Sequence, residues 1–178
     1  MNTYKNPEKN TWAELCKRPT IEKNNLKDII NQVFTEVQTK GDEALLDYTE
    51  RFDGVRLSQL QVSENECEEA EKQITENLKN AIKTAKNNIE KFHRSQIEEP
   101  KKIETTKGVV CWREARPISN MGIYIPGGTA PLFSTVLMLA IPAQIAGCKE
   151  VVLCTPPDEN GKINPAILYA AKLCGVTK

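Results

Sequence analysis

The stretch Gly122-Ile123-Tyr124-Ile125-Pro126-Gly127-Gly128-Thr129-Ala130-Pro131 decides the fold of this chain. Its apolar run, Ile123 to Ile125, predicts a buried strand. The strand should break at Pro126-Gly127-Gly128, because proline fixes φ and glycine permits positive φ. Pro131 is expected at the start of a helix, since its fixed φ is already helical, and that helix should end at Gly147. The stretch therefore predicts a strand, a glycine turn and a helix, the repeating unit of α/β proteins.

A turn of this kind can bind an anion such as a phosphate. It directs free backbone N–H groups and the positive end of a helix dipole toward one point. The segment lacks the G-x-G-x-x-G spacing of the usual dinucleotide fingerprint, however. A Gly-Gly turn between a strand and a helix also commonly does no more than turn the chain. Phosphate binding and a plain turn both remain open from these residues alone.

The residues after Gly147 repeat the alternation of strand and helix. The near-continuous apolar run 150–154 is typical of a parallel strand covered on both faces. A loop to Asn164 follows at the end of the strand where open α/β sheets bind ligands, and a further helix is predicted after it, over 165–173. Two parallel strands satisfy few backbone groups, so a third strand is expected after Gly175. We therefore expect an amino-terminal piece of a longer protein, unless the sheet is completed by the hairpin described below or by a partner chain.

The residues before Arg116 are predicted to be mainly helical from their apolar spacing and caps. The expected helices are 11–18, capped by Thr11; 22–40, with one buried apolar stripe and a left-handed Gly41 after it; 42–51, begun by Asp42; and 63–94, opened by a capping box of Ser63 and Glu66. Residues 55–62 are expected to be extended, and a hairpin is predicted around Lys107-Gly108. The chain then divides into an arm with a short helix (1–20), a helical region with a hairpin (21–116) and the start of an α/β domain (117–178).

The composition is that of an ordinary globular chain. It has 178 residues, 39% of them hydrophobic, and its 24 basic and 24 acidic side chains give a formal net charge of +0. A balanced charge provides no general attraction for nucleic acid or for an anionic membrane, and no apolar run is long enough to span a bilayer. The polar N-terminus lacks the apolar stretch of a signal peptide. We therefore expect a cytoplasmic protein with no nucleic-acid or membrane partner.

The residues most often used as metal ligands are few and scattered. The six cysteines contain no C-x-x-C pair and are predicted to be reduced, with Cys67, Cys148 and Cys154 in the core. The single histidine, His93, follows a polar helical stretch beside Arg94, where a solvent-facing role is expected. No constellation of three or four ligands for zinc is apparent within the chain.

Between Arg116 and Val176 the sequence resembles the histidinol dehydrogenase family. The matching segments are residues 116–117, 122–139, 145–148, 151–157, 167–171 and 173–176. The first half of the chain matches the family in shorter segments: Arg18-Pro19, residues 40–45 with Tyr48, Phe52-Asp53, Asn88-Ile89 and Phe92-His93. The resemblance covers nearly the whole chain but only the first part of the family's length.

The resemblance implies an α/β fold with an incomplete Rossmann-like parallel sheet and helices on both faces, preceded by the helical region and the hairpin. It also implies a zinc-containing homodimer that oxidises L-histidinol to L-histidinaldehyde and then to L-histidine, the last steps of histidine biosynthesis, with two NAD in succession. The family's Glu-His pair and its zinc ligands (Gln, His, Asp and His) would lie beyond residue 178. No catalytic or metal residue is therefore assigned here, and this piece alone is expected to be inactive.

The resemblance assigns one functional residue directly. Tyr124 matches a tyrosine that contacts NAD, and its ring could pack on the cofactor while its hydroxyl bonds to it. Pro126, Gly127 and Gly128 are the expected neighbours of the cofactor. Without the resemblance, Tyr124 would be interpreted as the end of a buried strand. The alternative function is a non-catalytic α/β interaction module, or a paralogue completed by a partner chain.

Overall fold

The computed structural model describes residues 3–18, 26–127 and 131–178. Contacts between residues divide the chain into two compact units, Met1–Gly41 and Asp42–Lys178. This division was not among the predicted boundaries, and the predicted division at residues 20 and 116 remains a prediction. The two units are described in turn.

The first unit contains a 3-10 helix, η1 (Lys9–Thr11), a one-turn helix, α1 (Trp12–Leu15), and a longer helix, α2 (Leu26–Lys40). The predicted short helix is present with Thr11 as its N-cap residue, but it spans Trp12–Leu15 rather than 11–18, and the predicted side-chain cap is absent. The Thr11 side chain makes no cap bond to the helix, and its hydroxyl instead donates to the Glu8 carbonyl at 2.7 Å.

The apolar stripe of α2 is present but is not buried, contrary to the prediction. Ile29, Ile30 and Phe34 are 47%, 44% and 67% exposed. The other described elements of this unit, η1 and α1, are too short to cover a stripe of four turns. The end of α2 is as predicted, because Gly41 has a φ of +61° and its N–H donates to the Val37 carbonyl at 2.9 Å. The predicted start near residue 22 lies outside the described residues.

The second unit begins with three helices: α3 (Asp42–Asp53), α4 (Glu64–Gln73) and α5 (Glu76–Arg94). The capping box of α4 is confirmed, since the Ser63 N–H donates to Glu66 Oε2 at 3.0 Å and the Glu66 N–H donates to Ser63 Oγ at 3.3 Å. The prediction of one helix over 63–94 was wrong. Ile74 is extended, and the Thr75 hydroxyl accepts from the Leu78 N–H at 3.3 Å, so Thr75 begins a new helix.

The connection between α3 and α4 contains no strand, although residues 55–62 were predicted to be extended. Val55 is buried there, and its side chain and that of Leu57 lie against Gly161. After α5, the predicted hairpin is confirmed as β1 (Ile103–Thr106) and β2 (Val109–Cys111), which pair antiparallel. Gly108, in the turn, has a φ of +83°. Both strands are exposed along their whole length.

The last part of the unit alternates as predicted: β3 (Asn120–Tyr124), α6 (Phe133–Ala146), β4 (Glu150–Cys154) and α7 (Pro165–Leu173). The two strands are parallel and in register from Asn120 opposite Glu150 to Tyr124 opposite Cys154. Pro131 does not begin α6, which starts two residues later with Leu132 as its uncapped N-cap. Gly147, with a φ of +88°, ends α6 as predicted.

The segment after α7 pairs with the free edge of β4, where a third strand was expected. The Thr177 N–H donates to the Val151 carbonyl at 2.8 Å, and the Leu153 N–H donates to the Lys178 carbonyl at 2.8 Å. The other edge of β4 bonds to β3, so β4 has neighbours on both sides.

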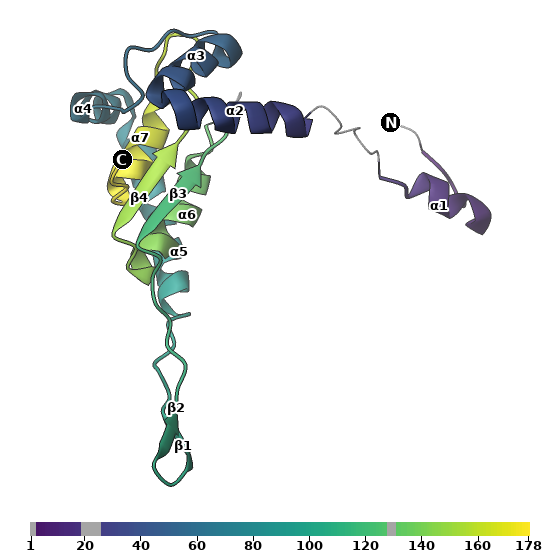
Figure 1. Cartoon of the computed structure of the whole chain (residues 1–178), viewed down its shortest axis with the longest axis vertical. Helices are drawn as coiled ribbons and strands as arrows, with labels where there is room; N and C mark the ends of the chain where they lie inside the picture. The colour runs from purple at the N-terminus through teal and green to yellow at the C-terminus, as the bar shows by residue number, and fades with distance from the viewer. Residues whose placement is uncertain (1–2, 19–25, 128–130) are drawn as a thin grey trace. The chain divides into compact units, whose positions relative to one another are not determined.

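The core lies between the parallel strands and the helices α5, α6 and α7 (Figure 1). Ile123 and Val151 contribute from the strands, Ile82 from α5, Leu137 from α6 and Ala170 from α7. The α/β class and the parallel pair are confirmed, but the described helices cover one face of the sheet rather than both. On the other face, Asn120, Gly122 and Tyr124 of β3 are exposed.

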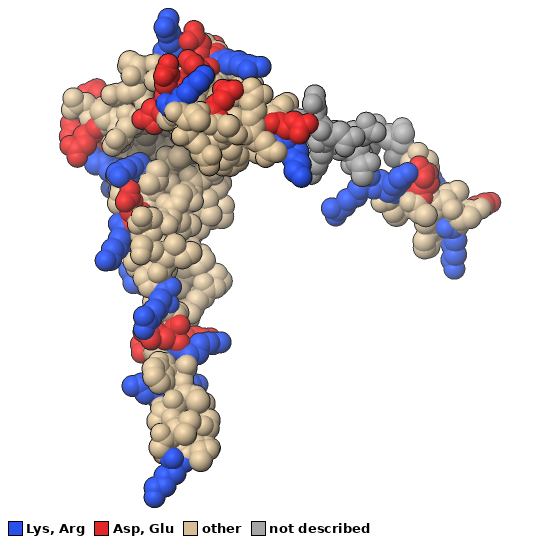
Figure 2. Space-filling view, in the orientation of Figure 1, with Lys and Arg blue, Asp and Glu red and all other residues tan. Residues whose placement is uncertain are grey.

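The surface seen in Figure 2 carries basic and acidic side chains interspersed over the helices, and its hairpin end is mostly uncharged. Exposed apolar side chains there include Ile103, Val109 and Val110. None of the helices in the described ranges has both the length and the apolar character needed to cross a membrane.

All six cysteines are free thiols, as predicted, but their burial differs from the prediction. Cys154 is exposed because the alternation of β4 turns it to the uncovered face, and Cys67 and Cys148 are half-buried. The fully buried cysteine is Cys174, and burial raises the pKa of its thiol to about 11. A thiol with so high a pKa is protonated at neutral pH and unreactive.

We expect iodoacetamide at about pH 8 to modify Cys111 and Cys154 in the folded protein and to leave Cys174 unmodified. Peptide mass spectrometry before and after addition of urea measures this, with full modification of Cys174 in urea as the control. Equal modification rates for Cys154 and Cys174 without urea would contradict the burial of Cys174 in the core.

Candidate functional site

The candidate site lies at the carboxyl ends of β3 and β4. The register places these two ends side by side, because Tyr124 is opposite Cys154 and the Ile125 N–H donates to the Cys154 carbonyl at 2.9 Å. The chain leaves the two strands through Pro126-Gly127 and through Thr155-Pro156-Pro157. This edge is where open parallel sheets bind ligands.

Tyr124 is on the uncovered face of the sheet. Its side chain is 63% exposed, and no hydrogen bond joins its hydroxyl to any residue that the structure describes. Ile125, the next residue, is fully buried, and Pro126 is exposed again. Tyr124 is therefore not a core residue at the end of a buried strand, and its ring is free to pack on a ligand.

Position 127 favours glycine because a larger side chain would clash with a neighbour, not because its backbone conformation requires glycine. Its φ is not positive, but a Cβ built on it would lie 2.6 Å from Cγ of Pro156. The loops after β3 and β4 thus touch at this point, and only glycine allows the contact without a shift of the backbone or of the proline ring. Gly128, the other glycine expected at the site, lies outside the described residues.

A pocket of about 720 Å³ opens beside this contact. Pro126 and Gly127 line it together with residues of α4, the loop 155–165 and the first turn of α7. Its volume is in the range of small-molecule sites. Of the residues predicted for the site, the structure brings Pro126 and Gly127 to this pocket, whereas Tyr124 does not line it.

The loop after β4 is fixed by its own hydrogen bonds. Asp158 Oδ1 accepts from the N–H groups of Asn160 at 2.9 Å and Lys162 at 2.8 Å. Lys162 Nζ then lies 3.3 Å from Glu66 Oε1, which joins the loop to α4. The Ser63 backbone N–H holds the pKa of the Glu66 carboxyl below its usual value, and Lys162 acts in the same direction.

Sequence reasoning did not single out Asp158, Lys162 or Glu69 as residues of the site. The loop after β4 was placed at the ligand side of the sheet, but its approach to α4 joins Glu66 and Lys162, which are 96 positions apart. No local pattern carries that information. The packing of α4 against α7 brings these residues together.

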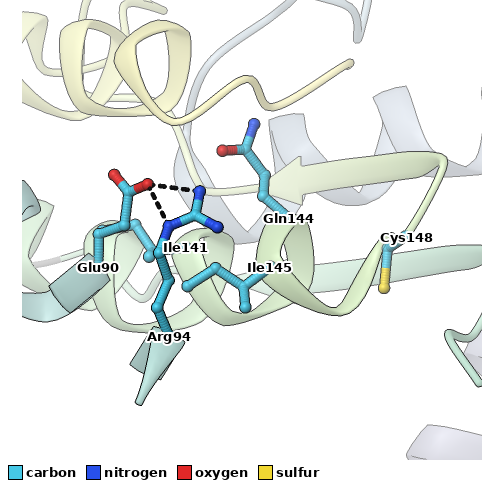
Figure 3. A pocket seen from close by; sticks show the side chains of 6 residues that line it. All are labelled: Glu90, Arg94, Ile141, Gln144, Ile145 and Cys148. Carbon is cyan, nitrogen blue, oxygen red and sulfur yellow. Dashed lines mark hydrogen bonds and ion pairs between the residues drawn. The ribbon is translucent and has the colours of Figure 1, made fainter. Parts of the chain in front are cut away.

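A second pocket, of about 430 Å³, lies between α5 and α6 (Figure 3). Glu90 and Arg94 line one side, and Gln144, Ile145 and Cys148 line the other. Glu90 Oε1 accepts from Arg94 Nε at 2.9 Å and Nη2 at 2.7 Å, while Oε2 accepts from Lys86 at 2.9 Å. These bonds, that from Lys86 first, hold the pKa of Glu90 below its usual value. A carboxylate with both oxygens engaged is a poor general base, so we assign no chemistry to this pocket.

Within the described ranges, no three His, Cys, Asp or Glu side chains converge in a way that could hold a metal ion. His93 contacts Gln96 instead, with Nδ1 at 2.8 Å from Oε1. The arrangement at the strand ends can therefore bind a small molecule through apolar walls, hydrogen bonds and one exposed ring, but it holds no metal centre among those residues.

Known proteins resemble this chain in both sequence and structure. The profile of the family described as histidinol dehydrogenase matches residues 16–178. The histidinol dehydrogenases of Bacteroides fragilis and Bacteroides thetaiotaomicron are 54% and 55% identical to this chain over all 178 residues. The crystal structure of histidinol dehydrogenase from Elizabethkingia anophelis superposes with a TM-score of 0.92 and is 54% identical. The chain spans 42% of the length of the two Bacteroides proteins and 41% of the crystallised chain.

We expect Gly127→Ala to lower the free energy of unfolding by about 1–3 kcal/mol, because the new methyl group overpacks against Pro156. Gly122→Ala is the matched control, since a Cβ there would meet no described atom within 4 Å. It should change stability by no more than about 0.5 kcal/mol.

Urea denaturation of the two variants, and of Gly127→Ala combined with Pro156→Ala, tests this contact. The double variant should recover part of the loss if the clash is the cause. Equal stability of Gly127→Ala and Gly122→Ala would show that the two loops do not touch as described.

Proposed function

Because this chain belongs to the histidinol dehydrogenase family, we propose that it forms the amino-terminal part of an NAD-dependent oxidoreductase of histidine biosynthesis. The whole enzyme would oxidise L-histidinol to L-histidinaldehyde and then to L-histidine. The observation that carries the proposal is similarity above 50% identity along the entire chain. Similarity of that extent favours it over a non-catalytic interaction module completed by a partner chain.

The role of this chain in that enzyme would be to bind NAD at the carboxyl ends of β3 and β4. NAD supplies the hydride acceptor when it is bound. Tyr124 offers an exposed ring on which a flat group of the cofactor can pack, and a hydroxyl that can donate to it. The contact between Gly127 and Pro156 keeps the strand-end loops compact, so that a ligand can approach the backbone closely. We propose Pro126 and Gly128 as further neighbours of the cofactor.

Zinc, which the family uses, does not fit the described residues of this chain, because they hold no group of three potential ligands. We therefore derive no step through zinc from this part of the enzyme and expect its ligands beyond residue 178. A homodimer in the cytoplasm that takes histidinol as its small-molecule substrate, with no nucleic-acid or membrane partner, completes the proposal.

The purified 178-residue chain should form no NADH from histidinol, whereas the full-length protein should form it in the presence of zinc. The physical reason is that the described residues include no convergent metal ligands, and the one histidine, in the last turn of α5, contacts Gln96. Absorbance of NADH in matched assays measures both. Histidinol-dependent NADH formation by the 178-residue chain would refute the proposal that the catalytic and metal residues lie outside it. Absence of NADH formation by the full-length protein would refute the proposed function.

In the full-length protein, Tyr124→Ala should raise the KM for NAD by about tenfold, equivalent to about 1.4 kcal/mol of lost binding. Tyr124→Phe separates the two contributions, because it keeps the ring and loses the hydroxyl. Tyr4→Ala is the control, since Tyr4 is similarly exposed but lies in the first unit. Steady-state kinetics with varied NAD measure the effect, and an unchanged KM in Tyr124→Ala would remove Tyr124 from the site.

A further inference from the structure

We propose that Glu66 is a positioning residue. Its ion pair with Lys162 holds the turn 158–162, and through that turn Pro156, in the place that ligand binding at the strand ends requires. This inference rests on the proposed function, because it takes NAD as that ligand. Glu66 acts through the loop after β4 and not on the reacting atoms.

The turn 158–162 is closed by its own hydrogen bonds. The Asp158 N–H donates to the Lys162 carbonyl at 2.8 Å, and the Gly161 N–H donates to the Asp158 carbonyl at 2.9 Å. Asp158 Oδ1 also accepts from the N–H groups of Asn160 and Lys162. Because these bonds join the first and last residues of the turn, a tie to Lys162 also acts on Asp158.

Two prolines connect this turn to the end of β4. Pro156 and Pro157 precede Asp158, and their rings fix φ, so this connection has few soft dihedral angles. The Pro156 ring lies against Gly127, where a Cβ would be 2.6 Å from its Cγ. A displacement of the turn is therefore passed to the contact between the two strand-end loops.

Glu66 is held ready for its role by the capping box. Its Oε2 is bound by the backbone N–H and the hydroxyl of Ser63, each at 3.0 Å, so Oε1 is left to face Lys162 Nζ at 3.3 Å. A carboxylate that is already fixed loses less side-chain entropy on pairing than a free surface side chain does. Helix α4 is itself tied to α7, since Lys172 Nζ lies 3.6 Å from Glu71 Oε2.

Glu66→Gln in the full-length protein separates the two functions of this side chain. Glutamine also serves in capping boxes, so its amide oxygen can still accept from the Ser63 N–H, while the charge that faces Lys162 is lost. The KM for NAD should rise about threefold, the size expected for the loss of a partly exposed ion pair. The kcat should not change, because the pair orients a binding surface and touches no reacting atom.

Lys162→Met removes the other partner and should raise the KM for NAD to the same extent. Lys162→Arg keeps the charge and should restore the value of the unaltered protein. The double variant, Glu66→Gln with Lys162→Met, should be no worse than either single variant, because both remove the same interaction.

Glu76→Gln is the matched control. It removes the same charge and an ion pair of the same kind, with Lys79 at 2.8 Å, but that pair lies within α5 and neither residue lines the pocket at the strand ends. The KM for NAD should not change in this variant.

Ionic strength provides a readout that a loss of folding would not produce. The side chains of Glu66 and Lys162 are 33% and 66% exposed, so salt can screen their attraction. The difference in KM between the unaltered protein and Glu66→Gln should shrink as sodium chloride is raised from about 0.05 M to about 0.5 M.

Hydrogen–deuterium exchange of the peptide that contains the turn gives a readout without NAD. The amides of Asn160, Gly161 and Lys162 should exchange faster in Glu66→Gln and Lys162→Met, because a turn released from α4 opens more often. Exchange in Glu76→Gln should match the unaltered protein. Thermal unfolding shows whether each variant is folded.

The outcomes separate this inference from the proposed function. Joint changes in KM and exchange, restored by Lys162→Arg, support the positioning role. If exchange rises but the KM for NAD is unchanged, the ion pair holds the turn without positioning it for NAD, and the inference is wrong. If the full-length protein reduces NAD with histidinol and neither readout changes, the inference is wrong and the proposed function stands. If the full-length protein does not reduce NAD at all, the proposed function fails and the positioning role fails with it.

Discussion

The parallel pairing of β3 with β4 is the constraint on which the rest of the second unit depends. Parallel strands cannot be joined by a tight turn, so the chain must cross over through α6, and α6 must bury its apolar surface against the sheet. In-register pairing from Asn120–Glu150 to Tyr124–Cys154 then ends both strands at one edge. The loops that follow, 125–127 and 155–157, are thereby brought together, and Gly127 lies against the Pro156 ring.

A second consequence of this pairing is that one face of the sheet is covered and the other is free. α6 packs against α5 and α7, and the three helices and the inner strand residues share one core. The alternation of side chains then sends Tyr124 and Cys154 to the uncovered face. The exposure of Tyr124 is thus set by strand register. A shift of one residue would bury its ring and expose Ile123.

Features encoded by neighbouring residues were predictable from the sequence. The capping box of Ser63 and Glu66, the left-handed Gly41 and Gly147, and the bounds of β4 all follow from residues a few positions apart. The break at Ile74-Thr75 was also local. It was missed because the apolar spacing runs through it without interruption, whereas the cap at Thr75 depends on a single hydroxyl. At this position the apolar spacing predicts one continuous helix, but the cap at Thr75 sets the boundary between α4 and α5.

Features that depend on long-range contacts were not predictable from the sequence. The stripe of α2 has the spacing of a buried face, but spacing cannot show whether an element is present to cover it, and in the described unit none is. Cys174 and Cys154 both lie next to apolar residues, yet the core shared by α5, α6 and α7 buries Cys174, and strand alternation exposes Cys154. The α4 residues that line the pocket were not predictable either, because the packing of α4 on α7 brings them there.

The packing of α4 on α7 brings the helical region to the strand ends. The candidate pocket is therefore lined both by α4 and by the loop that follows β4. The cap that starts α4 also orients Glu66, whose Oε2 is bound by Ser63 and whose Oε1 remains for Lys162. One carboxylate therefore fixes a helix start and a ligand-side loop together. Because Lys162 continues the loop that Asp158 organises, the geometry at the end of β4 depends on a capping box almost a hundred residues earlier. Helix α4 is in this sense part of the site, although it lies far from the two strands in the sequence.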